Sequence, residues 1–418
     1  MHLEVEMDYP RNLCKEIEPK LDLPEALFIL GPRQSGKTTL LKQLMRKVGE
    51  ERSIYIDLEF PELLRIFSMG VTEILKYLNY HRPNQNSRVF VFLDEVQYLS
   101  DFSHIVKLMV DHYSDQFKLV MSGSSSALIK YQFKESLVGR KLVYELFPLS
   151  FDEYLRFKAE DKLSDMLIYE PDSIPLDKIS ALENYLQDYI IYGGYPKVVK
   201  QVSRDDKRQI LLDIVNSYIL KDIKDLFKIE KTQQLNHLVR YLAANIGKHV
   251  NHQSLATEIM LHRETIQAYL EILEECYIIR RLKPYYQNLS TELKQMNKLY
   301  FVDSGIRNVL IDNLNELELR SDKGELFENF MYSHLFHNVK ADQKIRYWQT
   351  RNHQEIDFII TSSAMLLALE TKYSGDKSVS FAAFQRAYPD SVCRVLCFRN
   401  PNPARQELYG WQALGLLK

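Results

Sequence analysis

The stretch that decides the fold is Gly31-Pro32-Arg33-Gln34-Ser35-Gly36-Lys37-Thr38, which is followed directly by Thr39. It fits the pattern G-x-x-x-x-G-K-[ST] in full. The apolar run before it predicts a strand, and the leucine-rich run after it predicts a helix. Such a loop can wrap its backbone N–H groups around phosphate oxygens at the positive end of the helix. We therefore expect residues 31–39 to bind a nucleotide, rather than to form a chance surface loop.

Two side chains of this loop and two further acids have predicted roles in ATP hydrolysis. Lys37 is expected to reach the β- and γ-phosphates, and the Thr38 hydroxyl is expected to bind Mg²⁺. Asp94 ends the apolar run 89–93 and would join the Mg²⁺ shell, while Glu95 would polarise the attacking water as general base. ATP and Mg²⁺ are the expected cofactors. The Asp-Glu order favours hydrolysis over a small-molecule kinase, which needs no base for water.

Two further polar features lie after Asp94 and Glu95 in the chain. Each of them has two possible interpretations. Ser122 or Ser124, after another apolar run, would sense the γ-phosphate or orient the water, or would simply cap a helix. Arg140 is either an arginine finger, acting in its own chain or in a neighbouring subunit, or an ordinary surface arginine.

The first third of the chain alternates strand and helix signals. Short apolar runs lie at 26–30, 54–58, 89–93, 118–121 and 142–147, with helical patterns between them. Near-continuous hydrophobic runs are typical of a parallel sheet covered on both faces, so the fold class is α/β. The expected parts are an ATPase core at 1–150, a helical lid at 151–234, a winged-helix module at 235–290 and a nuclease-like C-terminal domain at 291–418.

The composition excludes several classes of protein. With 45% hydrophobic and 26% charged residues the chain belongs among globular proteins, not disordered ones. Its 54 basic and 56 acidic residues give a net charge of −2, so no global charge draws it to DNA or to an anionic membrane. The chain has neither a signal-peptide pattern nor an apolar run of about 20 residues, so we expect a cytoplasmic protein without a membrane partner.

These motifs together resemble a large group of uncharacterised prokaryotic AAA-family ATPases. The resemblance lies in residues 31–41, 92–97, 122–126 and 139–140, in 146–151, and in the turn Gly193-Gly194-Tyr195-Pro196. It covers nearly the whole chain and includes a C-terminal domain of unknown function. It implies an AAA-like core with parallel strands and a helical lid, and it implies no substrate.

Residues 252–282 predict two helices joined by a short turn and followed by a strand, which looks like a winged helix. On a DNA-binding interpretation the second helix would enter the major groove. Its expected exposed face carries the acids Glu264 and Glu271, and the strand offers only Arg280, Arg281 and Lys283 as a basic wing. A packing role is the favoured interpretation.

The C-terminal part contains a second candidate site. Asp357 lies in one predicted strand, Glu370 and Lys372 share one face of the next, and Glu328 lies on a predicted helix. Carboxylates suit Mg²⁺ or Mn²⁺, so Glu328, Asp357 and Glu370 are candidate ligands of a second metal, and Lys372 would hold the nucleophile. The set resembles the D…E-x-K core of restriction-endonuclease-like and Holliday-junction-resolvase-like nucleases, although Ile356 replaces the proline often found there. The alternative is a set of ion pairs on a sheet.

The sequence leaves two functions open. The first is an ATP-hydrolysing switch or motor that acts on DNA through the winged helix and the nuclease-like tail, where Tyr347 and Trp348 stack on bases or pack in the core. The second is an ATP-dependent regulatory or scaffold protein whose tail no longer cleaves and binds a protein partner. Oligomeric state is undetermined by sequence.

Overall fold

The computed structural model describes residues 9–82, 87–99, 102–124, 137–169, 173–285, 296–350, 352, 354–363, 365–375 and 379–417. The chain divides into two compact units. Unit 1 comprises residues 1–148 with 275–277, and unit 2 comprises 149–274 with 278–418. In the described part, no helix is long and apolar enough to cross a lipid bilayer.

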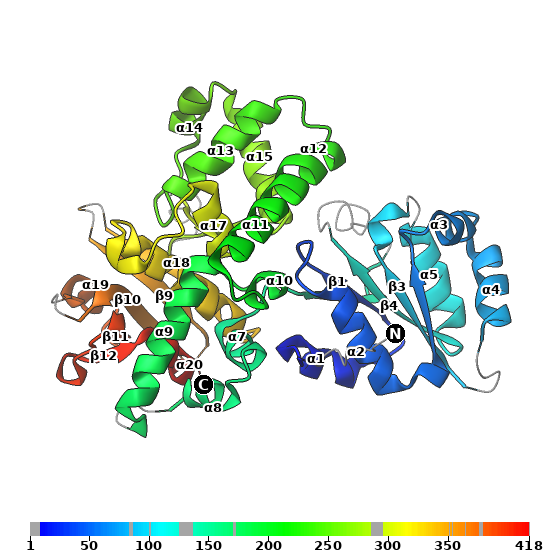
Figure 1. The fold of residues 1–418 in the computed structure, drawn as a ribbon, viewed down its shortest axis with the longest axis horizontal. Helices are drawn as coiled ribbons and strands as arrows, with labels where there is room; N and C mark the ends of the chain where they lie inside the picture. The colour runs from blue at the N-terminus through cyan, green and yellow to red at the C-terminus, as the bar shows by residue number, and fades with distance from the viewer. Residues whose placement is uncertain are drawn as a thin grey trace. The chain divides into compact units, whose positions relative to one another are not determined.

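Unit 1 is an α/β unit built on a parallel five-stranded sheet, as the apolar runs predict (Figure 1). The strand order is β2-β3-β4-β1-β5, so β4 lies between the strand that leads into the phosphate-binding loop and the strand that ends in Asp94. The strands are β1 (Ala26–Leu30), β2 (Ser53–Asp57), β3 (Val89–Asp94), β4 (Phe117–Gly123) and β5 (Lys141–Glu145). The helices are α1 (Asn12–Ile17), α2 (Lys37–Val48), α3 (Pro61–Ser68), α4 (Val71–Tyr80) and α5 (Phe102–Tyr113).

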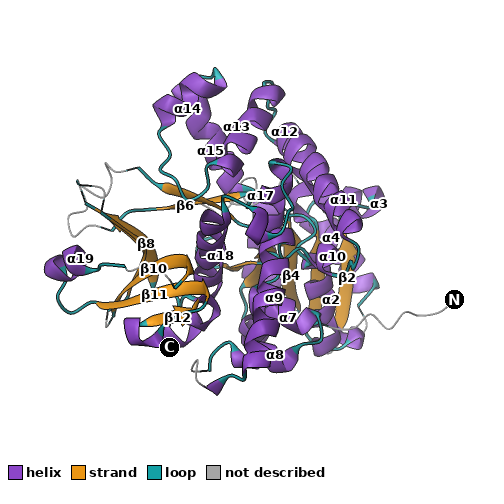
Figure 2. Ribbon diagram, turned by 60° about the vertical axis from the view of Figure 1, so that its left-hand side comes forward, coloured by secondary structure: helices purple, strands orange, loops and turns teal. Residues whose placement is uncertain are grey.

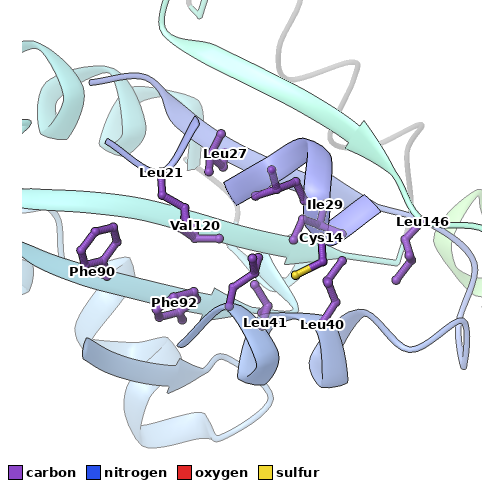
Figure 3. Packing of buried hydrophobic residues seen from close by; sticks show 12 residues of the cluster. Cys14, Leu21, Leu27, Ile29, Leu40, Leu41, Phe90, Phe92, Val120 and Leu146 are labelled. Atoms are coloured by element: carbon purple, nitrogen blue, oxygen red, sulfur yellow. The ribbon is translucent and has the colours of Figure 1, made fainter. Parts of the chain in front are cut away.

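Alternating side chains of β1 bury both faces of this sheet. Leu27 and Ile29 pack on one face against Leu40 and Leu41 of α2, in a core that also takes residues from α1, β3 and β4 (Figure 3). On the other face Phe28 meets Phe102 of α5 edge-on, with ring centroids 5.4 Å apart. Burial of β1 on both sides fixes the strand, and therefore the start of the phosphate-binding loop, in a rigid core.

Unit 2 begins with helices and continues into a helix–hairpin segment. The first helices are α7 (Phe151–Phe157), α8 (Asp161–Met166), α9 (Leu176–Tyr192), α10 (Pro196–Val199), α11 (Arg204–Ile214) and α12 (Ile223–Leu226), with a π-helix at Val215–Asp222. The turn at Gly193-Gly194 separates α9 from α10, as its glycines predict. The segment then contains α13 (Thr232–Ala244), α14 (His252–Ile259), α15 (Arg263–Glu275) and the antiparallel pair β6 (Ile279–Leu282) and β7 (Lys298–Phe301).

A second, mixed five-stranded sheet completes unit 2 (Figure 2). Its order is β12-β11-β10-β9-β8, with β8, β9 and β10 antiparallel and β10, β11 and β12 parallel. The elements are α17 (Ser304–Leu310), α18 (Lys323–Asn338), β8 (Lys344–Gln349), β9 (Glu355–Thr361), β10 (Leu366–Ser374), α19 (Ala382–Ala387), β11 (Val392–Arg399), β12 (Glu407–Tyr409) and α20 (Ala413–Leu416). Ring contacts of Phe327 with Phe398 and of Phe384 with Trp348 place α18 and α19 against this sheet.

Candidate functional site

The phosphate loop, residues 31–38, follows β1 and includes the first two residues of α2, Lys37 and Thr38. A Cβ on Gly31 would lie 2.1 Å from the carbonyl oxygen of Leu146, so only glycine fits there. Gln34 (φ 62°) and Gly36 (φ 99°) both adopt the left-handed region. The buried Arg11 donates to the Ser35 carbonyl at 2.8 Å and to the Phe147 carbonyl at 2.7 Å. The loop is therefore held in shape from several sides.

Lys37 is buried and has only neutral partners in its own loop. Its Nζ donates to the carbonyl oxygens of Gly31 at 3.1 Å and Pro32 at 2.8 Å. Burial lowers the pKa of Lys37 to about 8, although the charges of Glu95 and Asp94 oppose this. An anion at the loop would supply the missing counter-charge.

Asp94, at the end of β3, collects side chains from three neighbouring elements. Its Oδ2 accepts from the Thr38 hydroxyl at 2.6 Å and from the Tyr55 hydroxyl at 2.9 Å, and its Oδ1 accepts from Ser122. Tyr55 could not be predicted from the sequence, because its contact with Asp94 depends on β2 lying beside β3. Thr38 and Asp94 offer hard oxygen donors at one point, so they fit a Mg²⁺ ion.

Glu95 directly follows Asp94 and has an unusual backbone conformation, with φ 56° and ψ 45°. Its carboxylate accepts from Nε2 of Gln97, while Oε1 of Gln97 accepts from the backbone N–H of Ser124 at 3.2 Å. A left-handed backbone conformation at a non-glycine residue costs free energy, and such conformations are more frequent at functional sites. Gln97 thus joins Glu95, the predicted general base, to the end of β4. No local pattern in the sequence indicates this link.

Ser122 and Ser124 lie in different contacts at the end of β4. The side chain of Ser122 contacts Asp94, whereas Ser124 contacts Gln97 through its backbone. The geometry places Ser122, not Ser124, among the side chains around Asp94. Of the remaining loop residues, Gln34 and Thr39 are exposed and Arg33 is half-buried.

Arg140 does not belong to this group in its own chain. Its Nε lies 2.6 Å from Oδ1 of Asp111, and its carbonyl accepts from the N–H of Ala26 at 2.9 Å. Ala26 begins β1, whereas the phosphate loop follows the end of that strand. Arg140 therefore lies at the amino-terminal ends of the strands, whereas the phosphate loop lies at their carboxyl-terminal ends. The expectation of an arginine finger in the same chain is wrong. A role toward a neighbouring subunit stays a prediction.

In unit 2 the predicted residues form part of a larger group, here called the C-terminal cluster: Lys298, Glu328, Glu355, Asp357, Glu370 and Lys372. Glu328 and Asp357 line a cavity of about 560 Å³ together with Lys372. Glu370 lines a different cavity of about 280 Å³, again with Lys372. Burial and the charge of Asp357 raise the pKa values of both Glu328 and Glu370 to about 7.

The C-terminal cluster does not fit the second divalent ion that the sequence predicts. Across the described ranges, no three Asp, Glu, His or Cys side chains are grouped to hold a metal. Oδ2 of Asp357 accepts from the N–H and hydroxyl of Thr371, at 2.8 and 2.7 Å, and Lys372 pairs with Glu370 at 2.7 Å. Lys298 approaches Glu328, Glu355 and Asp357. The expected ligand set of Glu328, Asp357 and Glu370 is therefore not assembled, because lysines and the donors of Thr371 already engage an oxygen of each carboxylate.

Alternation predicts that Glu370 and Lys372 share one face of β10, and their 2.7 Å contact agrees with this. The strand pairing next to Asp357 is irregular. The ladder between β9 and β10 runs as far as Phe358 and Leu369, and the pairing of β8 with β9 shifts register between Arg346 and Trp348. A register shift re-aims side chains that alternation alone would assign to fixed faces. Asp357 lies at this irregular end, where its side chain, not a backbone carbonyl, receives the N–H of Thr371.

Most of the predicted nucleic-acid contacts of unit 2 are engaged within the protein, although Lys283 is exposed. Arg281 pairs with Glu274 at 2.7 Å, and the Arg280 guanidinium lies 4.6 Å from the centroid of Phe336. Tyr347 and Trp348 are buried, at 2% and 7% exposure, so they pack in the core and do not present faces for bases. The basic wing is accordingly weak.

Three segments of the chain match known families. Residues 24–155 match the AAA domain family, residues 183–317 match a domain of unknown function (DUF8612), and residues 323–416 match another domain of unknown function (DUF4143). An uncharacterized protein of Methanocaldococcus jannaschii is 26% identical over 351 residues, which are 83% of this chain and 74% of that protein.

Solved structures show more distant similarity. A Walker-type ATPase of Pyrococcus abyssi is 17% identical, with a TM-score of 0.45 over 72% of this chain and 95% of that one. The ORC2 protein of Aeropyrum pernix is 13% identical, with a TM-score of 0.37 over 72% of this chain and 90% of that one. The family match, together with the phosphate loop on its parallel sheet, supports an AAA-type P-loop ATPase core in residues 24–155.

Proposed function

We propose that the chain is an ATP-hydrolysing switch whose chemistry takes place in unit 1. The observation that carries the proposal is the meeting of Thr38, at the start of α2, with Asp94 and Ser122, near the ends of the parallel strands β3 and β4. Ligands bind outside the carboxyl ends of strands in open α/β sheets. The triphosphate would lie along the loop, with its charge balanced by Lys37.

Each residue has a distinct part in this proposal. Thr38 and Asp94 would hold Mg²⁺, which when bound neutralises charge on the phosphates. Glu95 would accept a proton from the attacking water, and Gln97 would orient the Glu95 carboxylate. Ser122 would report the state of the nucleotide through its contact with Asp94.

Magnesium dependence tests this proposal. We expect phosphate release from ATP to stop when EDTA removes Mg²⁺, and Asp94→Asn to lower kcat by about 100-fold or more, because a bound metal ion contributes several kcal/mol to transition-state stabilisation. The matched control is Asp57→Asn. Asp57 is the register partner of Asp94 at the end of the neighbouring strand β2, but its carboxylate accepts from the N–H of Glu59. Equal activity of Asp94→Asn and the control would contradict the role of Asp94.

For unit 2 we propose a regulatory part that responds to the nucleotide, contacts a protein partner and does not cleave DNA. Support comes from the engaged wing arginines and from the lysines that fill the C-terminal cluster. One observation favours a second candidate, a DNA-acting nuclease-like tail: Glu328, Asp357 and Lys372 line one cavity large enough to admit a ligand group.

A cleavage assay separates the two candidates. We expect the full chain, with Mg²⁺ or Mn²⁺, to cut linear, nicked or branched DNA no faster than its Asp357→Ala variant does, because lysine and backbone donors already engage the carboxylates. Cleavage that Asp357→Ala and Lys372→Ala each abolish, while ATP turnover persists, would establish the nuclease instead.

A further inference from the structure

Lys298 is a buried lysine that the site chemistry of unit 1 does not use. It is the first residue of β7, and its side chain is only 3% exposed. A buried ammonium is tolerated only where it is paired and hydrogen-bonded. Its partners therefore indicate what it does.

The partners of Lys298 are three carboxylates from two other elements. Its Nζ lies 3.0 Å from Oε1 of Glu328 on α18 and 3.6 Å from Oδ1 of Asp357 on β9, and it also pairs with Glu355 on β9. Burial disfavours the ammonium, but these three carboxylates outweigh that cost and raise the pKa of Lys298. Three carboxylates therefore balance the charge of the Lys298 ammonium at this point.

The carboxylate oxygens around Lys298 have further donors. The same Oε1 of Glu328 also accepts from the Tyr300 hydroxyl at 2.6 Å, and Oδ2 of Asp357 accepts from both donors of Thr371. A divalent ion placed between Glu328 and Asp357 would compete with these donors. It would also lie close to a buried ammonium, and like charges repel strongly where water is excluded.

We propose that Lys298 is the built-in cation of the C-terminal cluster and closes the position between Glu328 and Asp357 to Mg²⁺ and Mn²⁺. The cluster then joins the β6–β7 hairpin to α18 and β9 without a metal. The inference rests on the geometry of unit 2 alone, so it stands or falls independently of ATP hydrolysis in unit 1.

The test measures Mn²⁺ binding to the nucleotide-free full chain. The electron paramagnetic resonance signal of free Mn²⁺ reports how much of the ion stays unbound. We expect wild type and Asp357→Asn to bind Mn²⁺ equally poorly. Lys298→Met keeps the side-chain length but removes the charge, so it should gain one Mn²⁺ site, which is lost again when Asp357→Asn is added. Mn²⁺ should also raise the melting temperature of Lys298→Met, because a ligand that binds only the native state stabilises it.

Lys372→Met is the matched control, since Lys372 is 28% exposed and its ammonium pairs with Glu370. It should gain no site that depends on Asp357. If Lys298→Met does not fold, the comparison of Mn²⁺ binding between wild type and Asp357→Asn tests the inference alone. One equivalent of Mn²⁺ bound by wild type and lost in Asp357→Asn would overturn the inference, as would a folded Lys298→Met that gains no Mn²⁺.

Discussion

Glu95→Gln should lower kcat for ATP hydrolysis by about 10²–10⁴-fold, the usual contribution of a general base. Glutamine keeps the size of the side chain and its hydrogen bonding but cannot accept the proton from water. ATP affinity should change little, because the phosphate loop and Lys37 make the main contacts with the nucleotide. Rapid-quench turnover and equilibrium ATP binding, measured on the same preparation, separate the two effects.

A companion variant tests how Glu95 is positioned. Gln97→Ala removes the side chain that links the Glu95 carboxylate to the N–H of Ser124. It should lower kcat by about tenfold, less than the loss of the base itself, because only orientation is lost. Gln97→Asn is too short to span both partners and should resemble Gln97→Ala. Normal turnover in Glu95→Gln would assign the base to another residue, and full activity in Gln97→Ala would limit Gln97 to packing.

Lys37→Ala should weaken ATP binding by about 100-fold or more and remove measurable hydrolysis. Hydrogen bonds to charged groups contribute about 1.5–3 kcal/mol each, and every 1.4 kcal/mol is tenfold in affinity. In the free protein the ammonium donates to the carbonyls of Gly31 and Pro32, and a bound phosphate would add an anionic partner. Unchanged affinity and turnover in Lys37→Ala would remove this residue from the site.

The pKa of Lys37 adds a pH dependence with a definite sign. Below its value of about 8 in the free protein, Lys37 is protonated with or without nucleotide, so affinity should be flat with respect to this group. Above pH 8 Lys37 loses its proton in the free protein but keeps it in the nucleotide-bound protein. ATP affinity should therefore fall by up to about tenfold per pH unit. Calorimetry in buffers of different ionisation enthalpy would detect the proton uptake. Lys37→Arg should bind without this dependence, since arginine does not titrate in that range.

The parts of the site that follow one another along the chain could be predicted from sequence. The phosphate loop is local, and its strand and helix carry clear apolar patterns, so residues 31–39 and the parallel sheet were predictable. Asp94 was predictable as the acid that ends a buried strand. Tyr55 and Gln97 were not, because their contacts depend on the order β2-β3-β4 and on a turn after Glu95.

The C-terminal cluster shows the limit of strand alternation. The pattern correctly placed Asp357, Glu370 and Lys372 on adjacent strands, β9 and β10. It could not show the register shift beside Asp357, nor that Asp357 and Glu370 line different cavities. Lys298 lies on a hairpin far from these strands in sequence, so no local motif connects it with Glu328 or Asp357.

Calorimetric titration of the full chain with ATP, with and without Mg²⁺, tests the central claim most directly. The account predicts one ATP per chain, bound more tightly with Mg²⁺ because Thr38 and Asp94 then hold the ion, and bound about 100-fold or more weakly by Lys37→Ala. A wild-type chain that releases or absorbs no heat of association with ATP and Mg²⁺ would contradict it.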